Sequence, residues 1–297
     1  MSGVEPPGGP PDDRPRVGEV VVRRAFDGQR NLLIARGNFA GFLAGYREHV
    51  ARWELETDGL LDVMMRQGLA GLTLHLTARP EDESVGLTVN IRHPAINLFL
   101  TGDAVQSWLT GRAITEGVRT ADTSRLYVQS QRPGQEPSTS ILEIDGLDLL
   151  DIFEQYYRKS EQAPARFYEL AEDGFLGVFS LPGADLEWLE RLQPDEAAAV
   201  AASELSPLGQ KTFRLQCGCN PTKMLRVLRS LFRSQPDELF EGEGGVETHC
   251  PRCGARWWIE RAAFEAEKDA EDERGGATPR RPPRIPASVL ESEYCSR

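Results

Sequence analysis

Two short cysteine motifs decide the fold of this chain: CGC at residues 217–219 and CPRC at residues 250–253, with 30 residues between them. Thiolate sulfur is a soft ligand, and two such pairs can surround a zinc ion as a tetrahedron. Pro251 bends the second loop, and Gly254 permits the backbone conformation that brings amide groups near the sulfurs. The spacing therefore predicts one zinc site with four ligands: Cys217, Cys219, Cys250 and Cys253.

The segment between the two motifs has the pattern of a small folded module. Asn220 and Pro221 are typical of a helix start, as cap and first helical residue, and an apolar helix face follows at 224–232. Gly244 and Gly245 predict a turn into a strand that leads to the second motif, and 257–259 predicts its partner strand. Such a core is too small to fold unaided, so metal binding would supply most of its stability.

The residues alone leave the use of this site open. A static zinc ribbon would keep its metal, whereas a redox switch would lose it. Within each pair the cysteines are near enough to form a disulfide after modest movement. Oxidation of zinc-bound thiolates lowers metal affinity, and because zinc binding is coupled to folding, oxidation would unfold the module. A third possibility is that the four cysteines are buried separately and bind no metal.

Composition excludes several classes of protein. With 34 Lys and Arg against 46 Asp and Glu, the net charge is −12, which argues against nucleic-acid binding. No apolar run approaches the roughly 20 residues that span a bilayer. The first residues lack the hydrophobic core of a secretory signal, so we expect a cytoplasmic, reducing location, where cysteines serve as metal ligands or redox groups.

The chain of 297 residues divides into segments that together predict an α+β fold. We expect a disordered leader at 1–16, an N-terminal α+β domain at 17–183, a metastable helical linker at 184–212, a zinc-binding module at 213–264 and a charged disordered tail at 265–297. The linker prediction rests on an Ala- and Glu-rich stretch that is helical by propensity but has few apolar anchors.

Hydrophobic periodicity gives the expected elements of the first domain. The predicted strands are 19–26, 71–78, 85–91, 125–130, 139–144, 166–171 and 175–180. The predicted helices begin at Thr57 or Asp58, at Asp103 (103–112) and at Asp145 (145–157). The strand at 71–78 depends on the alternation of Leu72, Leu74 and Leu76 with small or polar residues.

The remaining chemistry-bearing residues do not form a catalytic pattern. We interpret His249 as a surface or packing residue, since its side chain should point away from that of Cys250. His49, His75 and His93 are scattered and suggest no triad. For 160–162 (SEQ), helix capping or domain packing is the favoured interpretation. For the tryptophans at 257–258, it is packing on the zinc module or docking of the module to the first domain. Cys295 is interpreted as a spectator thiol.

Taken together, these motifs resemble the 33 kDa heat-shock protein family of redox-regulated holdase chaperones. That family carries C-x-C, a longer gap and C-x-x-C, which 213–220 (FRLQCGCN) and 250–253 match. Residues 156–164 (YYRKSEQAP) resemble the family's tyrosine-to-SEQ-x-P segment at the end of a helix. The match covers roughly 138–260, with the order and spacing of both motifs intact.

The resemblance implies a mechanism and a set of partners. In the reduced state the four cysteines would bind zinc and the protein would be quiescent. Oxidation under mild unfolding stress would release zinc and form the disulfides Cys217–Cys219 and Cys250–Cys253. The module and linker would then lose structure, and apolar surface on the N-terminal domain and the linker would bind unfolding client proteins without ATP. A homodimer of the oxidised form is a further expectation, as is the absence of enzyme activity.

Two other functions compete with this one. A static zinc-ribbon adaptor that binds a specific protein partner would retain zinc under oxidants that modify ordinary exposed thiols. A thiol–disulfide oxidoreductase would need a free nucleophilic cysteine and a thioredoxin-like βαβ context, which the sequence does not offer.

Overall fold

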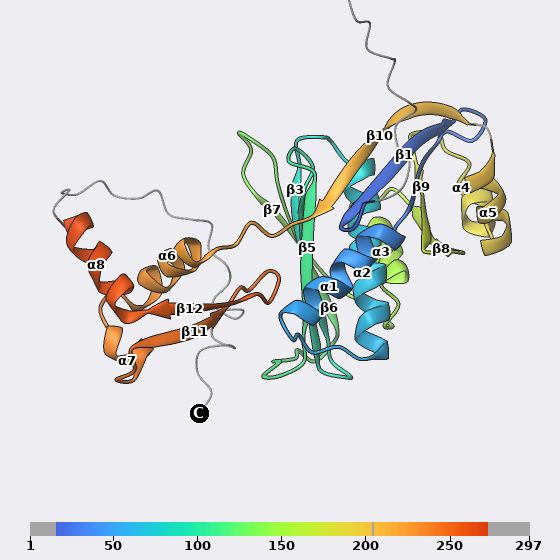
Figure 1. Ribbon diagram of the computed structural model, residues 1–297. Helices are drawn as coiled ribbons and strands as arrows, with labels where there is room; N and C mark the ends of the chain where they lie inside the picture. Colours follow the sequence, from blue (N-terminus) through green and yellow to red (C-terminus); the bar gives the residue numbers. More distant parts are fainter. Residues whose placement is uncertain (1–15, 204, 273–297) are drawn as a thin grey trace, which may run out of the picture.

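The computed structural model describes residues 16–203 and 205–272, and within them it shows an α+β protein in two parts (Figure 1). The larger part is a ten-stranded sheet with helices packed on it, and the smaller part carries the cysteine motifs. Almost all of the expected leader, most of the expected tail and Cys295 lie outside the described residues. The mixed α+β fold class is confirmed.

A single large sheet organises the larger part. Its strands, in spatial order, are β7 (Ser138–Glu143), β6 (Arg125–Gln131), β3 (Ser84–Ile91), β4 (Ile96–Asp103), β5 (Trp108–Ile114), β10 (Ser206–Leu215), β1 (Glu19–Asp27), β2 (Leu32–Asn38), β9 (Gly174–Ser180) and β8 (Ala165–Leu170). β10 pairs antiparallel with β1 and parallel with β5. The last strand of this part therefore joins the two halves of the sheet and leads directly to the first cysteine pair.

Helices cover the sheet on both faces. The main core lies under α1 (Ala40–Arg52), α2 (Gly59–Ala78) and α3 (Leu149–Tyr156), and α3 continues as a π-helical turn, η1 (Tyr157–Glu161). A second, smaller core lies where α4 (Leu186–Arg191) and α5 (Pro194–Ala202) cover β2, β8 and β9. Strand alternation explains this division, because Ile34 faces the second core while Ala35 faces the first.

The strand predicted at 71–78 is wrong, because these residues complete helix α2. Asp58 caps the helix as expected, since its side chain accepts a hydrogen bond from the Leu61 backbone N–H at 2.7 Å. Nearly every side chain between Met64 and Thr77 is buried. A helix buried on all sides has no polar face, so its leucines can fall into an alternating order by chance.

The helix predicted at 103–112 is also wrong. Asp103 does accept a hydrogen bond from a nearby amide, that of Gln106, at 2.7 Å, but it closes a turn rather than a helix. The chain then returns as β5, which pairs with β4 from Trp108 to Ile114. A capping aspartate stabilises turns and helix starts alike, so the signal does not distinguish them.

The helical linker predicted at 184–212 is correct only in its first part. α4 and α5 are helical, but β10 begins at Ser206. Pro207 and Gly209 oppose a helix, and Gly209 has a φ of 116°, which favours glycine. The backbone of this stretch instead bonds to β1.

The other elements expected in the larger part are present. Strands occupy the expected positions of β1, β3, β6, β7, β8 and β9, and α3 occupies the expected last helix. The sequence patterns did not reveal α1, β2, β4 or β5.

The smaller part has the helix and the two strands expected from its motifs, but the tail predicted from residue 265 is wrong at its start, because residues 265–272 continue a helix. It contains α6 (Pro221–Phe232), α7 (Pro236–Phe240), β11 (Gly245–His249), β12 (Arg256–Glu260) and α8 (Arg261–Asp272). Asn220 caps α6 by accepting a hydrogen bond from the Lys223 backbone N–H at 2.9 Å. β11 and β12 form an antiparallel hairpin whose tip points toward the large sheet (Figure 1). This tip carries the second cysteine pair.

Candidate metal centre

The two cysteine pairs lie on backbone turns that the sequence specifies. Cys217 and Cys219 follow the end of β10, and Gly218 between them has a φ of 64°. The Lys223 Nζ donates a hydrogen bond to the Gly218 carbonyl at 2.6 Å and holds this turn against the start of α6. Cys250 and Cys253 occupy the turn between β11 and β12, which is closed by the Gly254 N–H donating to the Cys250 carbonyl at 2.9 Å.

The structure brings all four predicted ligands together. Their Sγ atoms lie within 4.8 Å of one another. The Sγ of Cys217 is 3.6 Å from that of Cys250, and the Sγ of Cys219 is 3.6 Å from that of Cys253. A tetrahedron with Zn–S bonds of about 2.3 Å has edges of about 3.8 Å. The four sulfurs therefore fit a tetrahedral metal ion.

Hydrogen bonds among the four cysteines lower the pKa of Cys219 and Cys250 and raise the pKa of Cys217 and Cys253. The backbone amides of Cys253 and Ala255 hydrogen-bond to the sulfurs of Cys250 and Cys253, respectively. A hydrogen bond with Cys217 lowers the pKa of Cys219 to about 7. Hydrogen bonds with Cys217 and the other cysteines hold the pKa of Cys250 well below its usual range. Such a cluster shares protons that a cation can displace.

The two pairs differ in exposure. Cys250 and Cys253 are buried, whereas Cys217 and Cys219 are partly exposed. The two sulfur contacts of 3.6 Å each join one cysteine of the first pair to one of the second. Disulfides within each pair would therefore require the four-sulfur arrangement to open first.

Among the described residues, histidine does not contribute to the sulfur cluster. His249 is exposed, and its ring hydrogen-bonds to Glu247 at 3.2 Å, as expected for a surface residue. His49, which gave no signal in the sequence, has its Nε2 2.7 Å from the Cys253 carbonyl, although the two residues are 204 positions apart. A carbonyl can only accept, so the Nε2–H donates.

The second motif of the sequence lies in the larger part and has a packing role. Glu161 binds both Arg79 and the Tyr156 hydroxyl. The Tyr157 hydroxyl lies 2.9 Å from the Nδ1 of His75, which is buried. Burial lowers the pKa of His75 to about 4, so this histidine is neutral near pH 7. The interpretation of the SEQ segment as a packing element is thus confirmed.

The fold and the cluster define a two-part α+β protein with, at one end, a four-cysteine module whose sulfurs could hold a metal ion. A family model described as "Hsp33 protein" matches residues 57–260, and the chain belongs to the Hsp33 family.

Individual relatives share parts of the chain. The 33 kDa chaperonin of Nitrosococcus oceani is 24% identical over 169 residues, which make up 49% of this chain and 58% of that protein. The 33 kDa chaperonin of Brevibacillus brevis is 30% identical over 76 residues, or 26% of each chain. The chain thus spans 58% or less of the length of these curated relatives.

The crystal structure of the 33 kDa chaperonin (heat shock protein 33 homolog) from Thermotoga maritima has the same fold. It superposes with a TM-score of 0.64 at 15% identity and covers 85% of this chain and 99% of that chain. Separately, in the part of this chain that the structure describes, none of the helices combines the length and apolar character needed to cross a bilayer.

Proposed function

We propose that this protein is a redox-regulated, ATP-independent holdase chaperone whose switch is a zinc ion held by Cys217, Cys219, Cys250 and Cys253. The observation that carries the proposal is the four-sulfur cluster, with two contacts of 3.6 Å in a module that has little other core. Family membership supports the chaperone class. Zinc, when bound, would cross-link the two turns and stabilise the module.

The proposed oxidation balances with peroxide as the oxidant. Two thiolates give up two electrons and form one disulfide, and one hydrogen peroxide takes up these electrons and two protons to give two water molecules. Two peroxides therefore convert the four thiolates into Cys217–Cys219 and Cys250–Cys253 disulfides. A disulfide sulfur is a far weaker zinc ligand than a thiolate, so the metal leaves and the module loses its cross-link.

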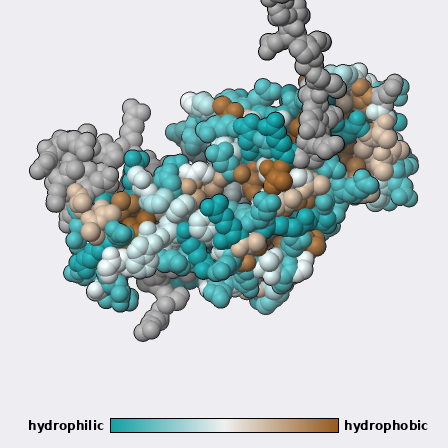
Figure 2. Space-filling view, in the orientation of Figure 1, coloured by the Kyte–Doolittle hydropathy of each residue, from teal (hydrophilic) through white to brown (hydrophobic). Residues whose placement is uncertain are grey.

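The described surface is consistent with a quiescent reduced form. Figure 2 shows a face that is mainly hydrophilic, with hydrophobic residues in small separate patches. A continuous apolar cluster lies beneath α4 and α5, where Leu32, Ile34, Leu176 and Val178 are almost completely buried. α4, α5 and the turn between them cover these side chains with few large buried anchors, chiefly Leu189 on α4 and Leu192 in the turn. Their release would expose a surface for unfolding client proteins.

The decisive experiment measures zinc and chaperone activity in one sample. Zinc-loaded protein is treated with hydrogen peroxide at a mildly elevated temperature, and released zinc is followed with a colorimetric chelator. Aggregation of a heat-denatured client is then followed by light scattering, without ATP. We expect zinc release together with suppressed aggregation, and reversal of both by a thiol reductant. Zinc-free, oxidised protein that leaves client aggregation unchanged would refute the proposal.

A static zinc-ribbon adaptor is the competing function, and the burial of Cys250 and Cys253 favours it. In that case zinc would remain bound at peroxide concentrations that oxidise an exposed reference thiol. Light scattering by the client would then be the same with peroxide-treated protein as with untreated protein. Gel filtration of the oxidised sample tests the expected homodimer in the same experiment.

A further inference from the structure

The turn that carries Cys250 and Cys253 is fastened to the larger part by two hydrogen bonds to the cysteines' own carbonyl groups. The Arg112 Nη1 on β5 donates to the Cys250 carbonyl at 3.1 Å. The His49 Nε2 near the end of α1 donates to the Cys253 carbonyl at 2.7 Å. Each bond fixes the peptide group of a cysteine whose sulfur belongs to the cluster. The larger part therefore constrains the backbone of the metal site directly.

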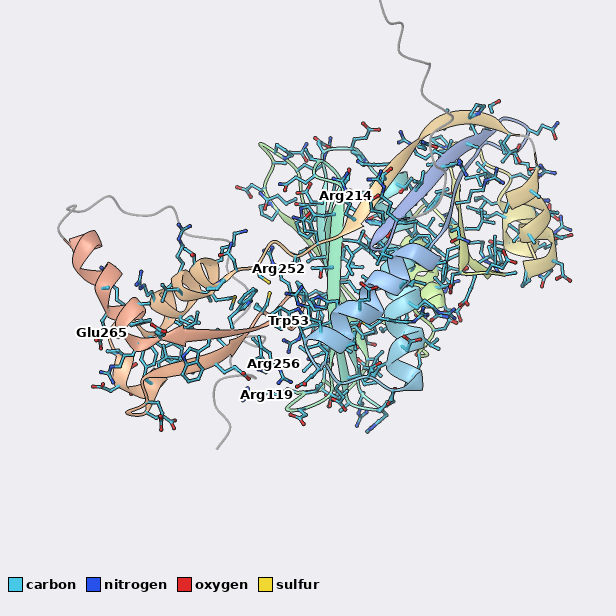
Figure 3. All side chains as sticks on the ribbon, in the orientation of Figure 1. Trp53, Arg119, Arg214, Arg252, Arg256 and Glu265 are labelled. Carbon is cyan, nitrogen blue, oxygen red and sulfur yellow. The ribbon has the colours of Figure 1, made fainter. Side chains whose placement is uncertain are left out.

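Other contacts join the same two parts of the protein beside these two hydrogen bonds. The rings of Trp53 and Trp257 pack with their centroids 5.4 Å apart. The Arg256 Nη2 donates to the Glu54 carbonyl at 3.3 Å. Figure 3 shows Trp53, Arg252 and Arg256 together where the hairpin tip meets α1.

The backbone approaches closely at the same place. A methyl group added to Gly254 would lie 2.8 Å from the Cδ2 of Leu55, so the glycine allows the turn to seat against the loop after α1. Polar bonds, an aromatic pair and a tight glycine contact thus coincide on one small area. This coincidence distinguishes the interface from a loose contact between two parts of a chain.

Groups that hold metal ligands in place affect the metal strongly although they never touch it. Loss of such an outer partner typically costs about 10- to 100-fold in metal affinity. A carbonyl bond holds the cysteine backbone, and through it the thiolate, in the position that a tetrahedral ion requires. Cys250 and Cys253 supply half of the four ligands, so freeing their turn removes half of the coordination geometry.

We propose that His49 and Arg112 are positioning residues of the metal site and that, by holding the carbonyls of Cys253 and Cys250, the larger part slows the release of zinc. This inference rests on the zinc binding in the proposed function but not on redox activation. The interface between the larger part and the turn is then coupled to the metal site. A change in the larger part that frees the turn weakens zinc binding, and loss of zinc frees the turn.

The test measures zinc release from the full-length, reduced, zinc-loaded protein into an excess of 4-(2-pyridylazo)resorcinol at fixed pH. His49→Ala and Arg112→Met should each release zinc about ten-fold faster than the unchanged protein. His49→Gln and Arg112→Lys keep a donor and should restore much of the slow release. Glu48→Gln, one residue from His49 on α1, and Arg125→Met, on β6, are matched controls and should leave the rate unchanged.

A variant on the module side of the interface tests whether faster zinc release comes from the interface or from unfolding of the large sheet. Arg256→Gln alters the module side without changing the large sheet, and it should also speed zinc release. Circular dichroism reports whether the sheet is intact in each variant. The proposal is overturned if His49→Ala, Arg112→Met and Arg256→Gln all release zinc within two-fold of the controls.

The outcome separates this inference from the proposed function. The chelator experiment contains no oxidant, so it reports on positioning alone. Slow release in the unchanged protein and fast release in the variants would support positioning even if peroxide had no effect on zinc or on client aggregation. Equal rates of zinc release in all variants, together with peroxide-dependent client protection, would refute the positioning role but not the chaperone proposal.

Discussion

Replacing Gly254 with alanine should weaken zinc binding through two separable costs. Gly254 has a φ of 75°, and its added methyl would lie 2.8 Å from one Leu55 methyl carbon and 3.1 Å from the other. The left-handed backbone costs alanine about 1–2 kcal/mol. Crowding in a packed contact adds roughly 1–3 kcal/mol, toward the lower end here because a leucine terminus can shift.

Gly242 provides the matched comparison within the same module. It has a φ of 88°, and a methyl group added there would meet nothing within 4 Å. Gly242→Ala therefore carries the backbone cost alone. Because metal binding and folding of the module are coupled, both variants should lose zinc affinity, and Gly254→Ala should lose about ten-fold more.

Competition with a chromogenic chelator gives the two zinc affinities, and a double-mutant cycle locates the difference. Leu55→Ala removes the crowding partner, so in that background Gly254→Ala should cost no more than Gly242→Ala. Trp53 and Trp257 fluorescence reports whether the hairpin tip remains seated. Equal zinc affinities for Gly254→Ala and Gly242→Ala would refute the inference that this turn is held against the loop after α1.

Two further predictions concern the core of the larger part. The pKa of His75 is lowered to about 4, so between about pH 6.5 and 4 the unfolded chain binds a proton that the folded chain does not. The unchanged protein should therefore lose roughly 3 kcal/mol of stability as the pH falls through this range. His75→Gln should remove this loss, as urea unfolding curves over the same pH range would show. Gly71→Ala should lower the melting temperature because its methyl would press on the Phe153 ring, whereas Gly59→Ala, in open space on the same helix, should not; equal melting temperatures would contradict the packing of α2 on α3.

The sequence predicted elements best where one face of the element is polar. α6 shows this well, because its cap at Asn220 and its apolar stripe are local signals, and both are present in the structure. α2 shows the opposite case, since burial on all sides erases the helical period that would have identified it. β10 could not be predicted as a central strand because its partners, β1 and β5, lie far away in the chain. Pairing with residues far away in the chain determines such a strand, and the local sequence carries no information about that pairing.

The same distinction applies to the metal centre. The four cysteines were predicted from spacing alone, because two closely spaced cysteine pairs are typical of a structural zinc site and the chain supplies them in the sequence itself. His49 and Arg112 could not be found in this way. Each reaches a backbone carbonyl, which every residue possesses, so no complementary residue type marks the partner. Only the approach of the turn between β11 and β12 to α1 and β5 creates these contacts.

The position of β10 divides the segment between the large sheet and the cysteines into two regions with different resistance to unfolding. At the last residue of β10 the Leu215 N–H donates to the Gly18 carbonyl at 2.8 Å, and at the next residue the Gln216 N–H donates to the Leu109 carbonyl at 3.0 Å, so the chain is bonded to the larger part almost up to Cys217. Loss of the metal therefore frees the module but leaves these bonds to be broken before any disorder can reach α5. α4 and α5 are held by a small core instead, so heat loosens them more readily than it loosens an internal strand. In the proposed chaperone, oxidation and mild unfolding stress accordingly act on different elements, and exposure of the client surface requires both.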